Sequence, residues 1–214
     1  MARCLRSWGE STLRSHPGSR HRKPEPPVGF TQAQLKAYEG QTVPDLVAPG
    51  IKLLFVGINP GLWTAATQTH FCHPSNRFYP ALRLAGLTDI EFDTDVGMSD
   101  SQRAQFLSRG IGITNLVARA TARASEIGSD ELRMGGKRLR ATIGDLAPSV
   151  AAIAGVTAYR TAFGEPGAKL GRQKGDLSGA EIWVLPNPSG LNAHETIATL
   201  SGWFTEVGKR AGLL

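Results

Sequence analysis

The chain has 214 residues, of which 41% are hydrophobic and only two are cysteines. This length suits one ordinary domain, and the apolar share is enough for a core that needs no metal or disulfide support. No segment approaches the roughly 18 consecutive apolar residues of a membrane helix, so we expect no membrane partner. Two cysteines are too few for a disulfide framework, and we expect a reducing, cytoplasmic compartment.

The formal net charge is +6 and the pI is near 9.7. Such a balance favours an anionic partner, most commonly nucleic acid. Part of the excess lies in residues 1–41, where arginines mix with serine, glycine and proline and apolar residues are too few to offset the entropy of ordering. We therefore expect a basic, largely disordered arm over 1–41, with a short helix at Thr31–Glu39, and a folded domain over 42–214. The arm is either a solvated extension without a role or a segment that raises non-specific DNA affinity at low salt.

From Pro49 onward the sequence alternates between strand and helix patterns. Short apolar runs bounded by glycine or proline predict strands at Ile51–Val56, Gly112–Leu116, Val150–Ala154 and Ile182–Leu185. Caps, acidic first turns and helical spacing predict helices at Asn76–Leu84, Ser101–Ser108, from a cap at Ser129 through Ile143, and from about His194 to Lys209. Strands separated by helices predict an α/β fold, a three-layer α/β/α sandwich with a mostly parallel central sheet.

Two loops each follow a strand, so both should open at the same edge of the sheet, where ligands of α/β folds collect. Gly57–Gly61 presents one polar amide, that of Asn59, and Asn187–Leu191 presents backbone donors, a hydroxyl and a leucine. The apolar side chain of Leu191 has two interpretations. Either it folds back as a hydrophobic staple for the last helix, or it enters an opened base step of DNA as a wedge.

These loops belong to a set of four motifs, which occur in the order Gly57-Ile58-Asn59-Pro60-Gly61, Phe71-Cys72-His73-Pro74-Ser75-Asn76-Arg77-Phe78, Gly112-Ile113-Thr114-Asn115-Leu116-Val117 and Asn187-Pro188-Ser189-Gly190-Leu191. In order and spacing they resemble the mismatch-specific uracil/thymine DNA glycosylases, within the uracil-DNA glycosylase superfamily. Glu131–Lys137 is similar to the family's helix after the third motif, and the resemblance runs from about Thr42 to the C-terminus. One such motif would be weak evidence, whereas four in register are specific.

The resemblance implies a monofunctional DNA glycosylase of base-excision repair that needs no cofactor. It would flip uracil opposite guanine out of double-stranded DNA and hydrolyse the N-glycosidic bond, leaving an abasic site, and we expect it to act as a monomer. Whether thymine or a modified cytosine also enters the pocket is left open. Leu191 would fill the vacated space, and the DNA-binding residues beside it would be Asn187, Ser189 and Gly190.

Within the base pocket, the resemblance makes Asn59 the catalytic residue, which would hold the attacking water by its amide and carbonyl. An amide can position water but cannot accept its proton at neutral pH. Phe71 would stack on the extruded ring, and Ile58 with nearby backbone amides would bind its carbonyl edge. The other substrate-binding residues implied are Gly57, Thr64 and Asn115.

Because an amide is a poor base, a carboxylate from elsewhere is an open alternative. The candidates are the acidic residues Asp89, Glu91, Asp93 and Asp95. Alternatively, these residues form a solvated acidic loop, which is held away from DNA because its charge would repel the phosphates. The chain also departs from the family pattern at Trp63, which bears on pocket width, and at Asn192-Ala193-His194, where the family often has a basic residue behind the wedge.

Two alternatives to a metal-free enzyme concern a metal site and a protein without catalytic activity. The cluster His70, Cys72 and His73 is spaced too tightly for a structural zinc site, so we expect no metal. The serious alternative to an enzyme is a non-catalytic protein that binds mismatched or damaged DNA on the same scaffold. Either class would use basic residues against phosphate, and fewer than half of the following candidates are expected to touch DNA: Arg119, Arg123, Arg133, Lys137, Arg138, Arg140, Arg172 and Lys174.

Overall fold

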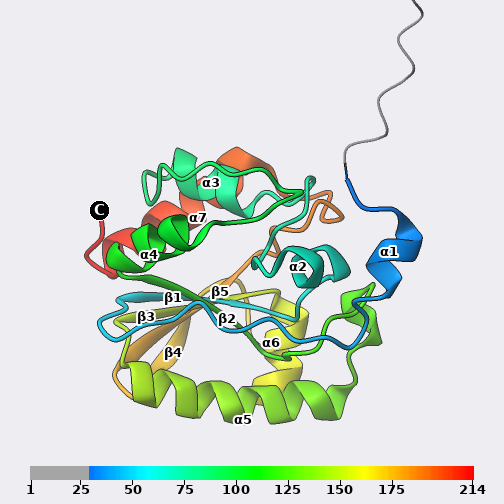
Figure 1. Cartoon of the computed structure of the whole chain (residues 1–214). Coiled ribbons are helices and arrows are strands. Elements are labelled where there is room, and N and C mark those ends of the chain that lie inside the picture. The colour runs from blue at the N-terminus through cyan, green and yellow to red at the C-terminus, as the bar shows by residue number, and fades with distance from the viewer. Residues whose placement is uncertain (1–28) are drawn as a thin grey trace, which may run out of the picture.

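The computed structural model describes residues 29–214, so most of the predicted basic arm, residues 1–28, lies outside the described part (Figure 1). The described residues form a five-stranded sheet in the order β2-β1-β3-β5-β4. The strands are β1 (Leu53–Gly57), β2 (Ile111–Asn115), β3 (Val150–Ala154), β4 (Gly171–Leu177) and β5 (Ala180–Leu185). Strands β2, β1, β3 and β5 run parallel to one another, and the edge strand β4 is antiparallel to β5.

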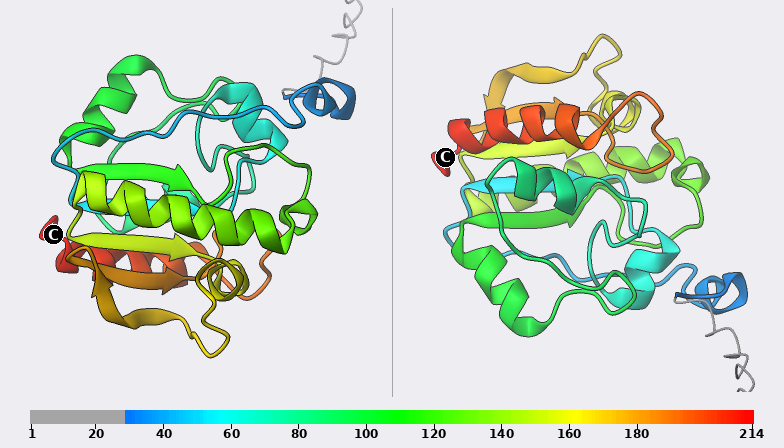
Figure 2. Two further views of the ribbon diagram at one scale, coloured as in Figure 1. Left: turned by 90° about the horizontal axis from the view of Figure 1, so that it is seen from below. Right: turned by 90° about the horizontal axis from the view of Figure 1, so that it is seen from above.

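The helices are α1 (Gln32–Lys36), α2 (Leu62–Thr67), α3 (Phe78–Leu84), α4 (Asp100–Ser108), α5 (Ser129–Leu146), α6 (Val156–Phe163) and α7 (Ile197–Arg210), with a 3-10 turn η1 at Ala124–Glu126. Helices α3, α4 and α7 cover one face of the sheet and α5 and α6 the other, as Figure 2 shows from both sides. The predicted three-layer α/β/α fold is therefore confirmed. None of the helices within residues 29–214 has both the length and the apolar character to cross a membrane.

Alternation along β1 divides its side chains between two cores, because successive residues of a strand point to opposite faces. Leu53 and Phe55 pack with Phe78 and Phe204 under α3 and α7. Leu54 and Val56 belong to the core under α5 and α6. All four β1 side chains are buried, so this strand is fixed on both faces and holds the loop that follows it in place.

Close packing explains the paired glycines of α5. A Cβ atom at Gly135 would lie 2.2 Å from the carbonyl oxygen of Leu116, and one at Gly136 would lie 2.3 Å from that of Ala162. Both distances are far below van der Waals contact, so only glycine lets α5 lie this close to the segment after β2 and to α6. The helix thereby supports the end of β2, where the third motif ends.

The predicted strands are confirmed to within about two residues at each end, and the expected helices α1, α3, α4, α5 and α7 are present. Some details were wrong. Gly128, not Ser129, caps α5, and α7 begins at Ile197 behind a Thr196 cap rather than near His194. Strand β4 and helices α2 and α6 were not predicted.

Candidate active site

A cavity of about 700 Å³ lies beyond the carboxyl ends of the parallel strands. Its walls come from the loops after β1, β2 and β5, from α1, from the start of α2 and from the segment between α2 and α3. Every predicted site residue except Gly57 lines it, namely Ile58, Asn59, Thr64, Phe71, Asn115, Asn187, Ser189, Gly190 and Leu191. Segments far apart in the sequence therefore meet at one edge of the sheet. It is the edge at which the loops Gly57–Gly61 and Asn187–Leu191 predicted a site.

The Asn59 amide nitrogen is fully engaged by the protein. Nδ2 donates to the carbonyl oxygens of Pro60 at 2.9 Å and Arg119 at 3.2 Å and to Thr121 Oγ1 at 2.8 Å. Thr121 in turn donates its hydroxyl to the carbonyl of Arg123. These acceptors fix the orientation of the amide, so Asn59 Oδ1 is the atom left for a ligand. The role of Asn59 in holding water stays a prediction, and the hydrogen bonds of Nδ2 leave the carbonyl oxygen as the atom that could do so.

Asn115 is oriented by a chain of hydrogen bonds through a buried histidine. His70 Nε2 lies 2.9 Å from the carbonyl oxygen of Pro44, which can only accept, so Nε2 carries the proton. In the neutral ring Nδ1 is then an acceptor, and Asn115 Nδ2 donates to it across 3.0 Å. Burial lowers the pKa of His70 and favours this neutral form. Asn115 therefore keeps its carbonyl oxygen for the cavity.

Gly57 makes room for that carbonyl oxygen. A Cβ atom at residue 57 would lie 2.3 Å from Asn115 Oδ1 and 3.2 Å from Phe71 Cζ. Among residues 29–214, Oδ1 accepts no hydrogen bond, and no fully buried side-chain nitrogen or oxygen is left without a partner. Asn115 Oδ1 is thus open to the cavity, next to the edge of Phe71.

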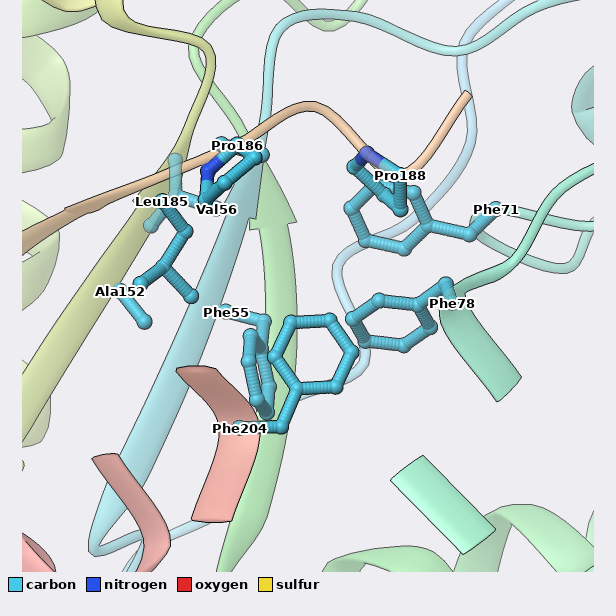
Figure 3. A pocket seen from close by; sticks show the side chains of 10 residues that line it. Phe55, Val56, Phe71, Phe78, Ala152, Leu185, Pro186, Pro188 and Phe204 are labelled. Carbon is cyan, nitrogen blue, oxygen red and sulfur yellow. The ribbon is translucent and has the colours of Figure 1, made fainter. Parts of the chain in front are cut away.

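Phe71 has a left-handed backbone (φ 55°) and a ring stacked on Phe78 at 4.1 Å between centroids. Beneath it lies a small apolar space, whose lining includes Pro188 and Phe204 (Figure 3). The Phe71 ring thus stands between this space and the larger cavity, lining both. An aromatic wall held by another aromatic ring suits stacking against a planar ligand.

Leu191 is 92% exposed at the rim of the cavity, so its interpretation as a hydrophobic staple is wrong. The loop around it is closed by its own side chains. Ser189 N donates to Asn187 Oδ1, Leu191 N donates to Ser189 Oγ, and Asn192 Nδ2 donates to the carbonyl of Asn187. Hydrogen bonds within the loop thus order it, and it holds the Leu191 side chain in solvent at the rim of the cavity.

The acidic run contributes nothing to the cavity, whose lining within residues 29–214 contains no Asp or Glu. Asp89 pairs with Arg109 and Glu91 with Arg83. Asp93 accepts a hydrogen bond from the backbone of Asp95 within its own turn. The alternative of a helping carboxylate from this run is therefore not retained.

Several candidate phosphate contacts are engaged elsewhere. Arg119 binds Glu131 through Nε and Nη2 and holds the pKa of that carboxyl at about 2. Arg138 donates to the carbonyls at the end of β2. Arg133 and Arg172 pair with acidic neighbours. Of the eight basic candidates, Arg123 is the one that lines the cavity.

The three residues weighed as metal ligands are committed to other partners. Both ring nitrogens of His70 are hydrogen-bonded, Cys72 Sγ lies 3.2 Å from the carbonyl oxygen of Thr94, and His73 Nδ1 accepts from the backbone of Ser75. Across residues 29–214, no three His, Cys, Asp or Glu side chains gather into a cluster that could hold a metal ion.

The site is thus an apolar and amide-lined cavity with an aromatic wall, at the carboxyl edge of an α/β sheet. A family model described as the uracil DNA glycosylase superfamily matches residues 44–206, well over half of the chain. The chain belongs to this superfamily.

A solved structure is similar in fold. It is the solution NMR structure of a candidate uracil DNA glycosylase from Methanosarcina acetivorans, with 17% sequence identity and a TM-score of 0.51. The match covers 79% of this chain and 98% of that one. At this identity the likeness supports the fold and not the activity.

Thr121 and His70 are site residues that the sequence motifs did not single out. Thr121 lies 62 residues from Asn59 in sequence, and His70 lies 45 residues from Asn115. In the sequence His70 resembles a metal ligand, whereas in the structure it binds the Pro44 carbonyl and the Asn115 amide. His70 directly precedes the second motif, and Thr121 follows the third motif within a few residues. This closeness to the motifs is the sequence signal that could have pointed to both residues.

Proposed function

We propose that the protein is a mismatch-specific uracil-DNA glycosylase, which flips uracil opposite guanine out of duplex DNA and hydrolyses its N-glycosidic bond. The observation that carries the proposal is a cavity into which two asparagines, Asn59 and Asn115, each present a carbonyl oxygen while their amide nitrogens are held by the protein. Residues 42–214 form the catalytic domain of this proposal, and the basic arm adds affinity for phosphate.

The polarity of Asn115 supports recognition of uracil. Uracil carries a hydrogen at N3, which Asn115 Oδ1 can accept, whereas the N3 of cytosine is itself an acceptor and would oppose it. An unpaired or opposed polar contact in a buried site costs about 1–3 kcal/mol, which corresponds to a factor of roughly five to a hundred or more. Phe71 would stack on the ring, and backbone groups near Ile58 would bind its carbonyl edge.

Asn59 would hold the water that attacks the sugar. Its Oδ1 accepts one hydrogen of that water and leaves an oxygen lone pair free to approach C1′. The amide cannot take the proton, so the gain is in position, and the reaction depends on a departing base that leaves as an anion. Donors aimed at the base oxygens would stabilise this charge. Such a mechanism is slower than one assisted by a carboxylate.

Leu191 and its loop support the selection of duplex mismatches. A G·U wobble pair costs less to open than a standard pair, and an apolar side chain inserted in the stack opposes return of the base. Leu191 is exposed and lies at the rim of the cavity, which suits this role. Asn187, Ser189 and Gly190 would contact the strands and the unpaired guanine.

Single-turnover release of uracil from G·U, A·U and single-stranded DNA tests the proposal, with cleavage at the abasic site by alkali as the readout. We expect release to favour G·U and to fall about a hundredfold or more in Asn59→Ala. Gln105→Ala, an exposed change on α4, should match the wild type. No release from any substrate, together with tight binding of mismatched DNA, would instead support the non-catalytic binding protein.

A further inference from the structure

Arg77, the N-cap residue of α3, binds the loop that carries Leu191. Its Nη1 donates to the carbonyl oxygens of Ser189 and Asn192, each at 3.0 Å, and its Nη2 lies 3.4 Å from that of Gly190. Its backbone N–H donates to the carbonyl of Pro188 at 3.0 Å. One residue therefore binds four carbonyl groups of a segment more than 110 residues away.

These contacts turn the carbonyl oxygens of the loop toward the protein. Carbonyl oxygens carry partial negative charge and would oppose the approach of a phosphate, so their direction matters for a DNA-binding loop. No carboxylate pairs with Arg77 among residues 29–214. The guanidinium is thus available to donate hydrogen bonds to the loop carbonyls. Its five N–H donors have fixed directions, so one arginine can bind several acceptors at once.

A second contact fixes the same loop on the same segment. A Cβ atom at Gly190 would lie 2.6 Å from the carbonyl oxygen of Ser75 and 2.4 Å from its Oγ. The loop therefore touches the chain just before Arg77, with no room for a side chain at residue 190. With both contacts in place, Leu191 extends away from the body of the protein with 92% of its surface exposed.

We propose that Arg77 is a positioning residue for base extrusion, which orders the Asn187–Asn192 loop in advance so that Leu191 enters the duplex without further ordering cost. This inference rests on the proposed function. Ordering a loop before binding saves the entropy that would otherwise be lost on contact with DNA. The effect concerns duplex substrates, because a single strand has no stack for Leu191 to enter.

The first test compares Arg77→Ala with Arg83→Ala, which removes a like charge from the same helix but does not contact the loop. We expect Arg77→Ala to lower single-turnover uracil release from G·U duplex about ten- to a hundredfold, and release from single-stranded DNA less than about threefold. Arg77→Lys should fall between, because one ammonium cannot replace the fork of a guanidinium. Equal losses on both substrates would show a general structural role and overturn the proposal.

A double-variant cycle tests whether Arg77 acts through Leu191. If it does, Arg77→Ala combined with Leu191→Ala should be no more than about threefold slower on duplex than Leu191→Ala alone, because the second change removes what the first one positions. Losses that multiply would mean independent roles and contradict the inference.

Two readouts do not depend on bond cleavage. Backbone hydrogen exchange of residues 187–192 should rise in Arg77→Ala and stay unchanged in Arg83→Ala. The fluorescence of 2-aminopurine placed beside the uracil should rise on binding of wild type and much less with Arg77→Ala. A normal fluorescence rise or unchanged exchange in Arg77→Ala overturns the role of Arg77. A wild type that flips the base but releases no uracil overturns the catalytic proposal instead.

Discussion

Asn115 Nδ2 lies 3.0 Å from His70 Nδ1, and this contact decides which end of the Asn115 amide faces the cavity. The direction follows from a carbonyl on the far side of the imidazole, that of Pro44, which requires the proton on Nε2. His70 does not line the cavity, yet it determines that Asn115 presents an acceptor and not a donor to a ligand there.

Two substitutions at His70 separate its contacts. Asn at residue 70 retains an acceptor near the position of Nδ1, whereas Gln retains a polar atom near that of Nε2 and leaves Asn115 without its acceptor. We expect His70→Gln to reduce single-turnover uracil release about tenfold, the effect of one hydrogen bond of about 1 kcal/mol or more, and His70→Asn to stay within about threefold. The reverse order of the two variants would contradict the assigned polarity.

Stability should fall in acid because of His70. Burial, the largest cause, lowers its pKa in the folded protein, Arg103 acts in the same direction, and the Pro44 bond and Asp45 act against it. The unfolded chain, with a histidine pKa near 6.5, then binds more protons as the pH falls, so the free energy of unfolding decreases from pH 7 toward pH 5.

Chemical denaturation at pH 7 and pH 5 checks this expectation. His70→Asn should show a smaller loss of stability between the two pH values than the wild type. His73, whose pKa is also lowered by burial, contributes in the same direction, so His73→Asn is the necessary comparison. The carboxyls with strongly lowered pKa, Glu131 and Glu181, are each at about 2 and titrate below this window. Equal pH dependence in wild type and His70→Asn would exclude the histidine as the cause.

Gly57 should be irreplaceable for activity rather than for folding. In Gly57→Ala the new methyl group would lie 2.3 Å from Asn115 Oδ1, so the amide must move away from the cavity. We expect uracil release to fall about tenfold or more, with destabilisation of about 1–3 kcal/mol. Gly167→Ala is the control, since a Cβ atom there meets nothing within 4 Å and Gly167 does not line the cavity. Similar release by both variants would show that the approach of Asn115 to Gly57 is unimportant.

The sequence predicted the parts of the fold that depend on apolar runs. Strands β1, β2, β3 and β5 are each buried along nearly their whole length, and such runs are visible without any tertiary information. Strand β4, Gly-Arg-Gln-Lys-Gly-Asp-Leu, has no apolar run because it is an exposed edge strand. Its antiparallel pairing comes from a tight turn at Ser178 and Gly179, both with positive φ, which a Ser-Gly pair signals only weakly.

Motifs likewise located the site but not its hydrogen bonding. Asn59 and Asn115 were named from their motifs, yet the acceptors that orient them, Thr121 and His70, come from other segments. Spacing in sequence cannot reveal which end of an amide is occupied, because that depends on atoms brought together by the sheet. The same holds for Arg77, whose motif gave no indication that it binds the loop after β5.

Asn59→Asp tests the orientation of the Asn59 amide. The substitution would place a carboxylate oxygen against the carbonyls of Pro60 and Arg119, now 2.9 and 3.2 Å from Nδ2, and leave only the Thr121 hydroxyl able to donate. These acceptors disfavour the charged form and raise the carboxyl pKa above its usual value of about 3.9. The folded state then holds its proton more tightly than the unfolded state, so the variant loses stability relative to wild type as the pH rises from 4 to 7.

Thermal unfolding across that range measures the difference. Asn76→Asp is the control, because the Asn76 side chain accepts a hydrogen bond from the backbone of Phe78 through Oδ1, a role that a carboxylate performs equally well. We expect Asn59→Asp to be less stable than wild type by about 1–3 kcal/mol at pH 7 and by less at pH 4. A pH-independent difference, or none, would mean that Asn59 Nδ2 is not the atom facing these acceptors, and that its carbonyl oxygen is not the one presented to water.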